Sequence, residues 1–166
     1  MCEIKIRNVK MGDEKILAYI QTESWKTAFR EILTPQILSE YTHVPQVEAM
    51  YQRVIASNRA AGYILTVDEH PYCIAFWGKC ADANHPDSAE LICIHSLCDK
   101  GRQGLGSMMI RHIFSQARVA HYSEMVLWVF KENTRARKFY EKHGFQCTND
   151  CKTTFGAPEV MYAKFL

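Results

Sequence analysis

A glycine-rich turn at residues 101–107 constrains the fold of this chain more than any other segment. The turn reads Gly-Arg-Gln-Gly-Leu-Gly-Ser and follows Ala89–Leu97, whose apolar residues on both faces predict a strand buried on each side. After the turn, apolar residues recur at helical spacing at Leu105, Met109, Ile113, Ala117 and Ala120. A buried strand, a tight turn and an amphipathic helix in succession are typical of an α/β domain.

The periodicity of the remaining sequence predicts a mixed arrangement of strands and helices. Strands are predicted at residues 3–9, 63–67, 72–79, 89–97, 124–130, 145–147 and 160–165. Three helical stretches are predicted between the first two strands, the first capped by Asp13, and two more helices at 105–120 and 133–143. A four-residue turn at 68–71 joins the second and third strands. We expect a single α/β (α+β) domain over residues 1–166, with a mixed central sheet flanked by helices.

Composition and charge exclude several classes of function. The 166 residues are 48% hydrophobic and 23% charged, which is typical of a globular domain, and the net charge of +2 is too small to indicate nucleic acid or an anionic membrane as a partner. The first residues are charged and alternating, so no signal peptide is expected, and no apolar run is long enough for a transmembrane helix. Seven scattered cysteines fit reduced thiols, and we expect a cytoplasmic protein.

A metal site is not expected from this sequence. Cys147 and Cys151 lie four residues apart, but no histidine or second cysteine pair stands at ligand spacing nearby. Cys73 and Cys93 fall in apolar strand patterns and are predicted to be core residues.

The glycine-rich turn is a candidate phosphate site. A turn of this kind leaves backbone N–H groups unpaired at a helix N-terminus, where the helix dipole adds partial positive charge. Gly104 and Gly106 lack the Cβ atoms that would block close approach, and Arg102 adds charge at the rim. The alternative interpretation is an ordinary glycine-rich connection, because the spacing fits neither the P-loop nor the dinucleotide-binding pattern.

A second segment, residues 127–145, carries a specific resemblance. It reads Leu-Trp-Val-Phe-Lys-Glu-Asn-Thr-Arg-Ala-Arg-Lys-Phe-Tyr-Glu-Lys-His-Gly-Phe and resembles the signature Leu-x-Val-x-x-x-Asn-x-x-Ala-x-x-Phe-Tyr-x-x-x-Gly-Phe of the GCN5-related N-acetyltransferase (GNAT) superfamily. The glycine turn resembles the pyrophosphate loop of that family, with Gly104 and Gly106 at the matching places and Gly101 where Gln or Arg is usual. Together the two signatures cover about residues 88–147.

The resemblance implies a fold, a donor substrate and a cleft. The fold is the GNAT acyl-CoA N-acyltransferase fold, and the acetyl donor is acetyl-coenzyme A (acetyl-CoA). The pantetheine arm lies in a cleft between residues 89–97 and 125–130. The implied cofactor-binding residues are Ile94, His95, Ser96, Leu97, Arg102, Gln103, Gly104, Leu105, Gly106, Ser107, Asn133 and Tyr140.

The resemblance also implies catalytic roles, and each has a structural alternative. Tyr140 matches the tyrosine that protonates the departing thiolate, or else it is a core aromatic. Asn133 matches a cofactor contact and is equally suited to cap a helix. Glu90 and His95 are candidate bases for the amine, or else a surface charge and a buried histidine. Because they are five residues apart, a regular strand would place them on opposite faces unless a bulge intervenes.

The implied reaction is direct attack of a primary amine on the thioester, with no metal and no covalent enzyme intermediate. We expect a small-molecule acceptor; the alternatives are a protein or peptide N-acetyltransferase and a non-catalytic acyl-CoA-binding sensor. The protein is expected to be a monomer or homodimer. Several aromatic residues are candidates either for the acceptor pocket or for the core, namely Trp25, Phe29, Tyr41, Trp77 and Trp128.

Overall fold

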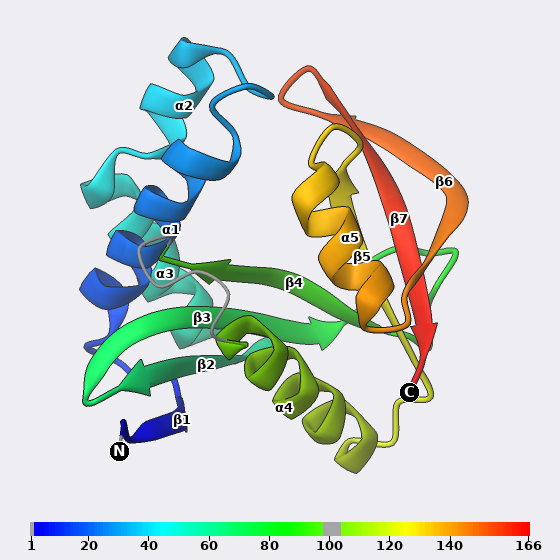
Figure 1. The fold of residues 1–166 in the computed structure, drawn as a ribbon, viewed down its shortest axis with the longest axis horizontal. Coiled ribbons are helices and arrows are strands. Elements are labelled where there is room, and N and C mark those ends of the chain that lie inside the picture. The colour runs from blue at the N-terminus through cyan, green and yellow to red at the C-terminus, as the bar shows by residue number, and fades with distance from the viewer. Residues whose placement is uncertain (1, 98–103) are drawn as a thin grey trace.

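A mixed sheet of seven strands forms the centre of the computed structural model, which describes residues 2–97 and 104–166 (Figure 1). The strands lie in the order β1-β2-β3-β4-β5-β7-β6. They are β1 (Ile4–Asn8), β2 (Ala60–Val67), β3 (His70–Lys79), β4 (Ala89–Ser96), β5 (Glu124–Phe130), β6 (Gln146–Thr154) and β7 (Ala157–Phe165). The helices are α1 (Glu14–Ala28), α2 (Pro35–Tyr41), α3 (Val44–Ser57), α4 (Leu105–Val119) and α5 (Thr134–Lys142). The fold class predicted from the sequence is confirmed.

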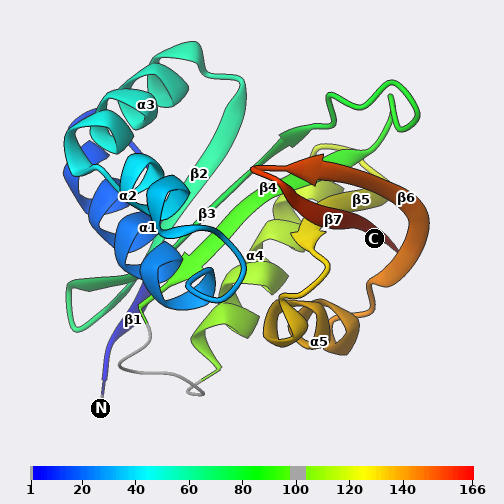
Figure 2. The same cartoon turned by 90° about the horizontal axis from the view of Figure 1, so that it is seen from above.

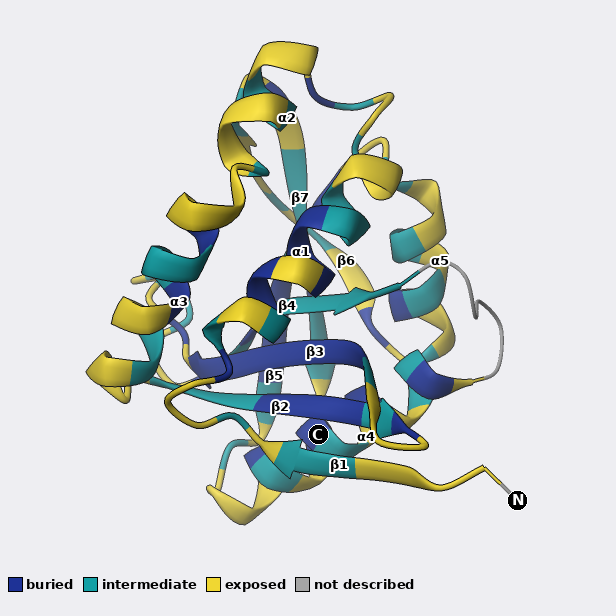
Figure 3. Cartoon of the chain, turned by 90° about the vertical axis from the view of Figure 1, so that its left-hand side faces the viewer, coloured by how far each residue is buried: buried dark blue, intermediate teal, exposed yellow. Residues whose placement is uncertain are grey.

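Helices cover both faces of the sheet. Figure 2 shows α1, α2 and α3 on one side and α4 and α5 on the other. Leu17, Ile20 and Val47 of α1 and α3 pack on Ile64 and Ile74 of the sheet. The apolar stripe of α4 packs on the opposite face, and β3 between the two layers is buried along most of its length (Figure 3). Among the described residues, no helix is both long and apolar enough to cross a membrane.

One local expectation is wrong and another is right only in part. Val67 pairs with His70, so the turn of the β2–β3 hairpin has two residues, Asp68 and Glu69, both at positive φ. Asp13 precedes α1 as expected, but its side chain does not cap the helix. Its carboxylate instead accepts two hydrogen bonds of 2.8 Å from the Arg7 guanidinium, which holds the pKa of Asp13 below its usual range.

The C-terminal hairpin is longer than the sequence predicts. The strands predicted at residues 145–147 and 160–165 extend to Thr154 and back to Ala157, and a two-residue turn of Phe155 and Gly156 joins them. The pattern hides this extension because β6 is a polar edge strand, half-exposed or exposed on both faces. An irregularity in the pairing between Cys147 and Cys151 also breaks its alternation.

The sheet splits between β4 and β5. These strands run parallel but pair only at Ala89 with Met125 and at Glu90 with Val126. Beyond Glu90, β4 stays paired with β3 as far as Ser96, while β5 stays paired with β7. The edge of β4 that faces β5 therefore carries backbone N–H and C=O groups with no partner strand. This is the cleft that the resemblance implies.

A bulge in β4 changes which side chains share a face. Phe76 of β3 pairs with Cys93, but the next residue, Trp77, pairs with Leu91, so Ile92 is the extra residue. Because the bulge shifts the alternation by one residue, Glu90 and His95 lie on the same face of β4. That face is the one covered by α1 and α3, since Cys93 packs against the core of those helices.

Candidate active site

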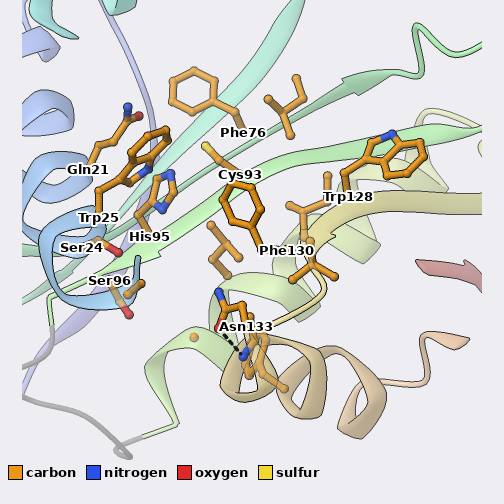
Figure 4. Close-up of a pocket in the computed structure, with 18 of the residues that line it drawn as sticks. Gln21, Ser24, Trp25, Phe76, Cys93, His95, Ser96, Trp128, Phe130 and Asn133 are labelled. Carbon is orange, nitrogen blue, oxygen red and sulfur yellow. Dashed lines mark hydrogen bonds between the residues drawn. The ribbon is translucent and has the colours of Figure 1, made fainter. Parts of the chain in front are cut away.

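The split between β4 and β5 opens into a cavity of about 990 Å³. Its walls come from α1, α3, β4, β5, the first turn of α4, α5 and the β6–β7 hairpin. Figure 4 shows Gln21, Ser24 and Trp25 of α1 gathered beside His95 of β4, with Asn133 at the opposite wall. The cavity thus reaches both faces of the sheet, which allows two molecules to meet in the gap.

The first turn of α4 provides unpaired N–H groups on the α4–α5 side of this cavity. Gly104 precedes the helix at φ 76°, and the first hydrogen bond in the helix runs from the N–H of Met108 to the carbonyl of Gly104, at 3.0 Å. The N–H groups of Leu105, Gly106 and Ser107 therefore have no partner in the helix, and no other described residue accepts from them. Free N–H groups at a helix N-terminus, where the helix dipole adds partial positive charge, are suited to bind an anion.

The two described glycines of the turn, Gly104 and Gly106, differ in backbone conformation and in what surrounds them. Gly104 adopts a left-handed conformation, and a Cβ atom built there would meet no atom within 4 Å. A Cβ atom on Gly106 would lie 3.5 Å from the Phe139 ring, an ordinary van der Waals distance, so the packing of α5 does not by itself require glycine there. Gly101, Arg102 and Gln103 lie outside the described residues.

Asn133 caps α5 and lines the cavity at the same time. Its Oδ1 accepts a hydrogen bond from the N–H of Ala136 at 3.2 Å, as the capping interpretation predicts. The NH₂ group of the same side chain has no partner among the described residues and remains available to a ligand. The two interpretations of Asn133 are therefore compatible, because each uses a different end of the amide.

Tyr140 packs in the core and also lines the cavity. Its ring contacts Phe139 and Phe145, with ring centroids 5.5 and 5.8 Å away. Burial raises the pKa of its phenol above the ordinary value of 10. The hydroxyl therefore stays protonated throughout the physiological range and is available as a donor.

The two candidate bases have different positions. His95 lines the cavity, and burial lowers the pKa of its imidazole to about 4, so the ring is neutral near pH 7. Glu90 is half-buried at the start of β4, where β4 and β5 are still paired, and it is not among the residues that line the cavity. Its carboxylate lies near Cys80 and contributes to the raised pKa of that thiol.

Cys93 is the only cysteine among the described residues that line the cavity, and its environment makes it unreactive. The side chain lines the cavity, and burial raises the pKa of the thiol to about 12. Because the thiolate is the nucleophilic form, Cys93 is protonated at neutral pH. Cys73 is buried, as predicted, and its pKa is likewise raised to about 12. No group of metal-binding side chains is found among the described residues.

The remaining sequence candidates divide between the cavity and the core. Ile94 and Ser96 line the cavity, whereas Leu97 packs between the two cores. Among the aromatic candidates, Trp25, Phe29 and Trp128 line the cavity, Tyr41 is exposed and contacts Phe155, and Trp77 is in the core.

Sequence reasoning missed the contribution of the β6–β7 hairpin. Thr154, Phe155 and Glu159 line the cavity, and Glu159 is its only carboxylate among the described residues. No local signal marks these residues, since their placement depends on a hairpin that folds back across the sheet.

The site thus combines a sheet split between parallel strands, free amides at the helix that follows and a buried phenol in the gap. Residues 18–145 match the Acetyltransferase (GNAT) family, and the chain belongs to this family. The protein is an acetyl-CoA-dependent N-acetyltransferase.

One curated relative and two solved structures illustrate this similarity, and the two structures share the fold. A probable N-acetyltransferase of Mycobacterium tuberculosis is 27% identical over 145 residues, which cover 86% of this chain and 79% of the relative. The PaiA N-acetyltransferase of Thermoplasma acidophilum, solved in complex with coenzyme A, has a TM-score of 0.84 at 17% identity and is covered to 99% in both chains. The ribosomal-protein-S18-alanine N-acetyltransferase of Escherichia coli has a TM-score of 0.67 at 21% identity, over 98% of this chain and 94% of the other.

Proposed function

We propose that this protein acetylates the primary amine of a small molecule by direct attack of the amine on acetyl-CoA. The observation that carries the proposal is the gap between β4 and β5, which leads from the free N–H groups of α4 into a cavity reaching the α1–α3 side of the sheet. One substrate can enter from each face and meet the other in the gap. Holding the two side by side accounts for a large part of the rate.

The donor side of the site has groups that fit coenzyme A. In this proposal the amides of Leu105, Gly106 and Ser107 bind the pyrophosphate, and the Asn133 NH₂ group donates to the same molecule. Arg102 and Gln103 join them in the proposal, although they lie outside the described residues. The unpaired edge of β4 at Ile94–Ser96 binds the amides of the pantetheine arm as an added strand would, and its N–H groups polarise the thioester carbonyl.

Direct attack is favoured over an acetyl-enzyme on a cysteine because Cys93, which lines the cavity, is not activated. Cys93 holds its proton at neutral pH, as the raised pKa requires. The nitrogen lone pair therefore attacks the thioester carbon, the carbon–sulfur bond breaks, and the thiolate leaves. We assign the protonation of that thiolate to the hydroxyl of Tyr140.

For the proton that the amine gives up, we propose that Glu90 acts through water and that His95 mainly forms the cavity wall. An unburied imidazole would be the better base, but burial brings the pKa of His95 to about 4 and removes that advantage. The bulge at Ile92 supports the assignment, because it directs Glu90 to the face of β4 from which the acceptor approaches.

A small acceptor is favoured over a protein because aromatic side chains cover the acceptor end of the cavity. Phe155 at the tip of the β6–β7 hairpin lies 4.3 Å from Tyr41 and 6.1 Å from Trp25, measured between ring centroids. These contacts join the hairpin to α1 and α2 above the cavity. A polypeptide would have to displace them to reach the gap.

The test is a screen of amine classes with acetyl-CoA and the purified protein. Free thiol release is measured with polyamines, amino acids, aminoglycosides, simple monoamines and peptides, and mass spectrometry identifies the acetylated product. We expect amine-dependent thiol release with at least one small amine and none with peptides. Efficient acetylation of peptides alone would replace the small-molecule proposal with a protein acceptor. Tight binding of acetyl-CoA without turnover of any amine would indicate a binding module.

A further inference from the structure

Glu159 is a carboxylate in the cavity with an unused oxygen. It lies on β7, its side chain is 13% exposed, and it is the only acidic residue among the described residues that line the cavity. Its Oε2 accepts a hydrogen bond of 2.6 Å from Thr154 and lies 3.6 Å from the ammonium of Lys152. Its Oε1 has no partner among the described residues. A partly buried carboxylate with one unpaired oxygen is suited to bind a cation from the cavity.

The position of Glu159 places it near the reaction. It pairs with Phe130, the last residue of β5, and side chains of cross-strand partners project from the same face of a sheet. Phe130 lines the cavity, so the carboxylate is at the end of the gap where β5 has parted from β4. It lies across the sheet from the first turn of α4, where the donor phosphates are proposed to bind. Glu159 is thus on the acceptor side.

Aromatic side chains surround the same end of the cavity. Phe29 packs edge-on against Phe130 at 5.1 Å and against Trp25 at 5.1 Å. Phe155 completes this wall from the hairpin tip at φ 53°, a left-handed backbone conformation that costs a residue with a side chain about 1–2 kcal/mol. The hairpin therefore holds an aromatic ring against α1 at a position where asparagine or glycine would be unstrained.

The charges that line the rest of the cavity are positive. Arg135 and Lys142 are on α5, beside the proposed donor site, and Arg59 is exposed just beyond the end of α3. A second ammonium group on an acceptor would find no anion among the described lining residues. The electrostatics of the cavity therefore favour an acceptor with one positive charge.

We propose that Glu159 binds the ammonium group of the acceptor, and that the acceptor is a small monoamine whose apolar body packs against Trp25, Phe130 and Phe155. The proposal rests on the proposed function and names the class of its substrate. The ammonium binds to the free Oε1. It then gives up a proton through water to Glu90, the base of the proposed function, and the neutral amine attacks the thioester.

The test compares two substitutions of the same ion pair that have opposite expected effects. Binding of 2-phenylethylamine to the coenzyme A-loaded protein is measured by calorimetry for the wild type, Glu159→Gln and Lys152→Met. Glu159→Gln should weaken binding about 10- to 100-fold, because it removes a charge-assisted hydrogen bond. Lys152→Met should strengthen it, since Glu159 then has no competing cation. Affinity for coenzyme A, measured in the same way, should be unchanged in both variants.

The outcomes separate this proposal from the proposed function. Equal weakening in both variants would mean that the ion pair only supports the hairpin, and unchanged binding in Glu159→Gln would mean that the ammonium binds elsewhere; either result overturns the proposal. Stronger binding of 1,4-diaminobutane than of 2-phenylethylamine would also overturn it, as would failure of 2-phenylethylamine to bind to a protein that binds coenzyme A. Failure of the wild type to bind coenzyme A would instead contradict the proposed function.

Discussion

Gly104→Ala should lower both the free energy of unfolding and the affinity for acetyl-CoA, and the two effects have different causes. In the free protein the new methyl group has open space, since no atom lies within 4 Å of its position. The stability cost therefore comes from φ 76° and amounts to about 1–2 kcal/mol. In the complex, the methyl group would project where a phosphate approaches the amides of α4. Loss of one charge-assisted hydrogen bond weakens binding about 10- to 100-fold.

Gly12→Ala is the matched control. Gly12 precedes α1 at φ 99°, also with no atom within 4 Å of a built Cβ, and it does not line the cavity. Both variants should lose similar stability in chemical unfolding, while calorimetry should show weaker acetyl-CoA binding only for Gly104→Ala. Wild-type affinity in Gly104→Ala would refute the phosphate cradle. Equal losses of affinity in the two variants would show that destabilisation, not contact, is responsible.

Four further substitutions test the proposed roles. Tyr140→Phe should lower kcat on the order of 10²-fold with little change in acetyl-CoA affinity; because the pKa of Tyr140 is raised, its ionisation should not limit the wild-type rate below pH 10. An unchanged single-turnover rate would make Tyr140 a core residue only. Asn133→Ser should keep the helix cap, and thus the unfolding free energy, but weaken acetyl-CoA binding in calorimetry; unchanged binding would leave only the cap. In pH profiles of kcat/KM, Glu90→Gln should lose most activity at low pH, whereas His95→Gln should keep the wild-type shape because the pKa of His95 is about 4. Loss of the acidic limb in His95→Gln alone would reverse that assignment.

The donor side of the site could be predicted from the sequence because it is local. The strand at 89–97, the turn, the helix that begins at Leu105 and the Asn133 cap each follow from patterns within a few residues. The specific spacing from Asn133 to Phe145 then ties these elements to one family. Gly104 and Asn133 consequently occupy the positions that the sequence predicts.

The acceptor side could not be predicted because it is assembled over long sequence distances. Glu159 meets the cavity only because β7 pairs with β5, and Phe155 meets Trp25 only because the hairpin extends further than its polar sequence suggests. The bulge at Ile92 cannot be recognised in the apolar pattern of β4. It nevertheless places Glu90 and His95 on the same face of the strand.

The burial of a side chain, and the pKa shift that burial causes, cannot be predicted from the local sequence pattern either. An isolated imidazole titrates near pH 6.5, and only burial beside α1 brings His95 to about 4. The same burial raises the pKa of Cys93 and excludes it as a nucleophile at neutral pH. These shifts support the roles proposed for His95 and Cys93, and they follow from the packing of helices that are distant in the sequence.

Direct transfer between two bound substrates is tested most directly by initial rates at varied concentrations of both acetyl-CoA and a confirmed amine. Both molecules must be bound together for attack in the gap, so double-reciprocal plots should give lines that intersect. Incubation with acetyl-CoA alone should leave the mass of the intact protein unchanged. Parallel lines, together with an acetylated protein that passes its acetyl group to the amine, would contradict direct attack.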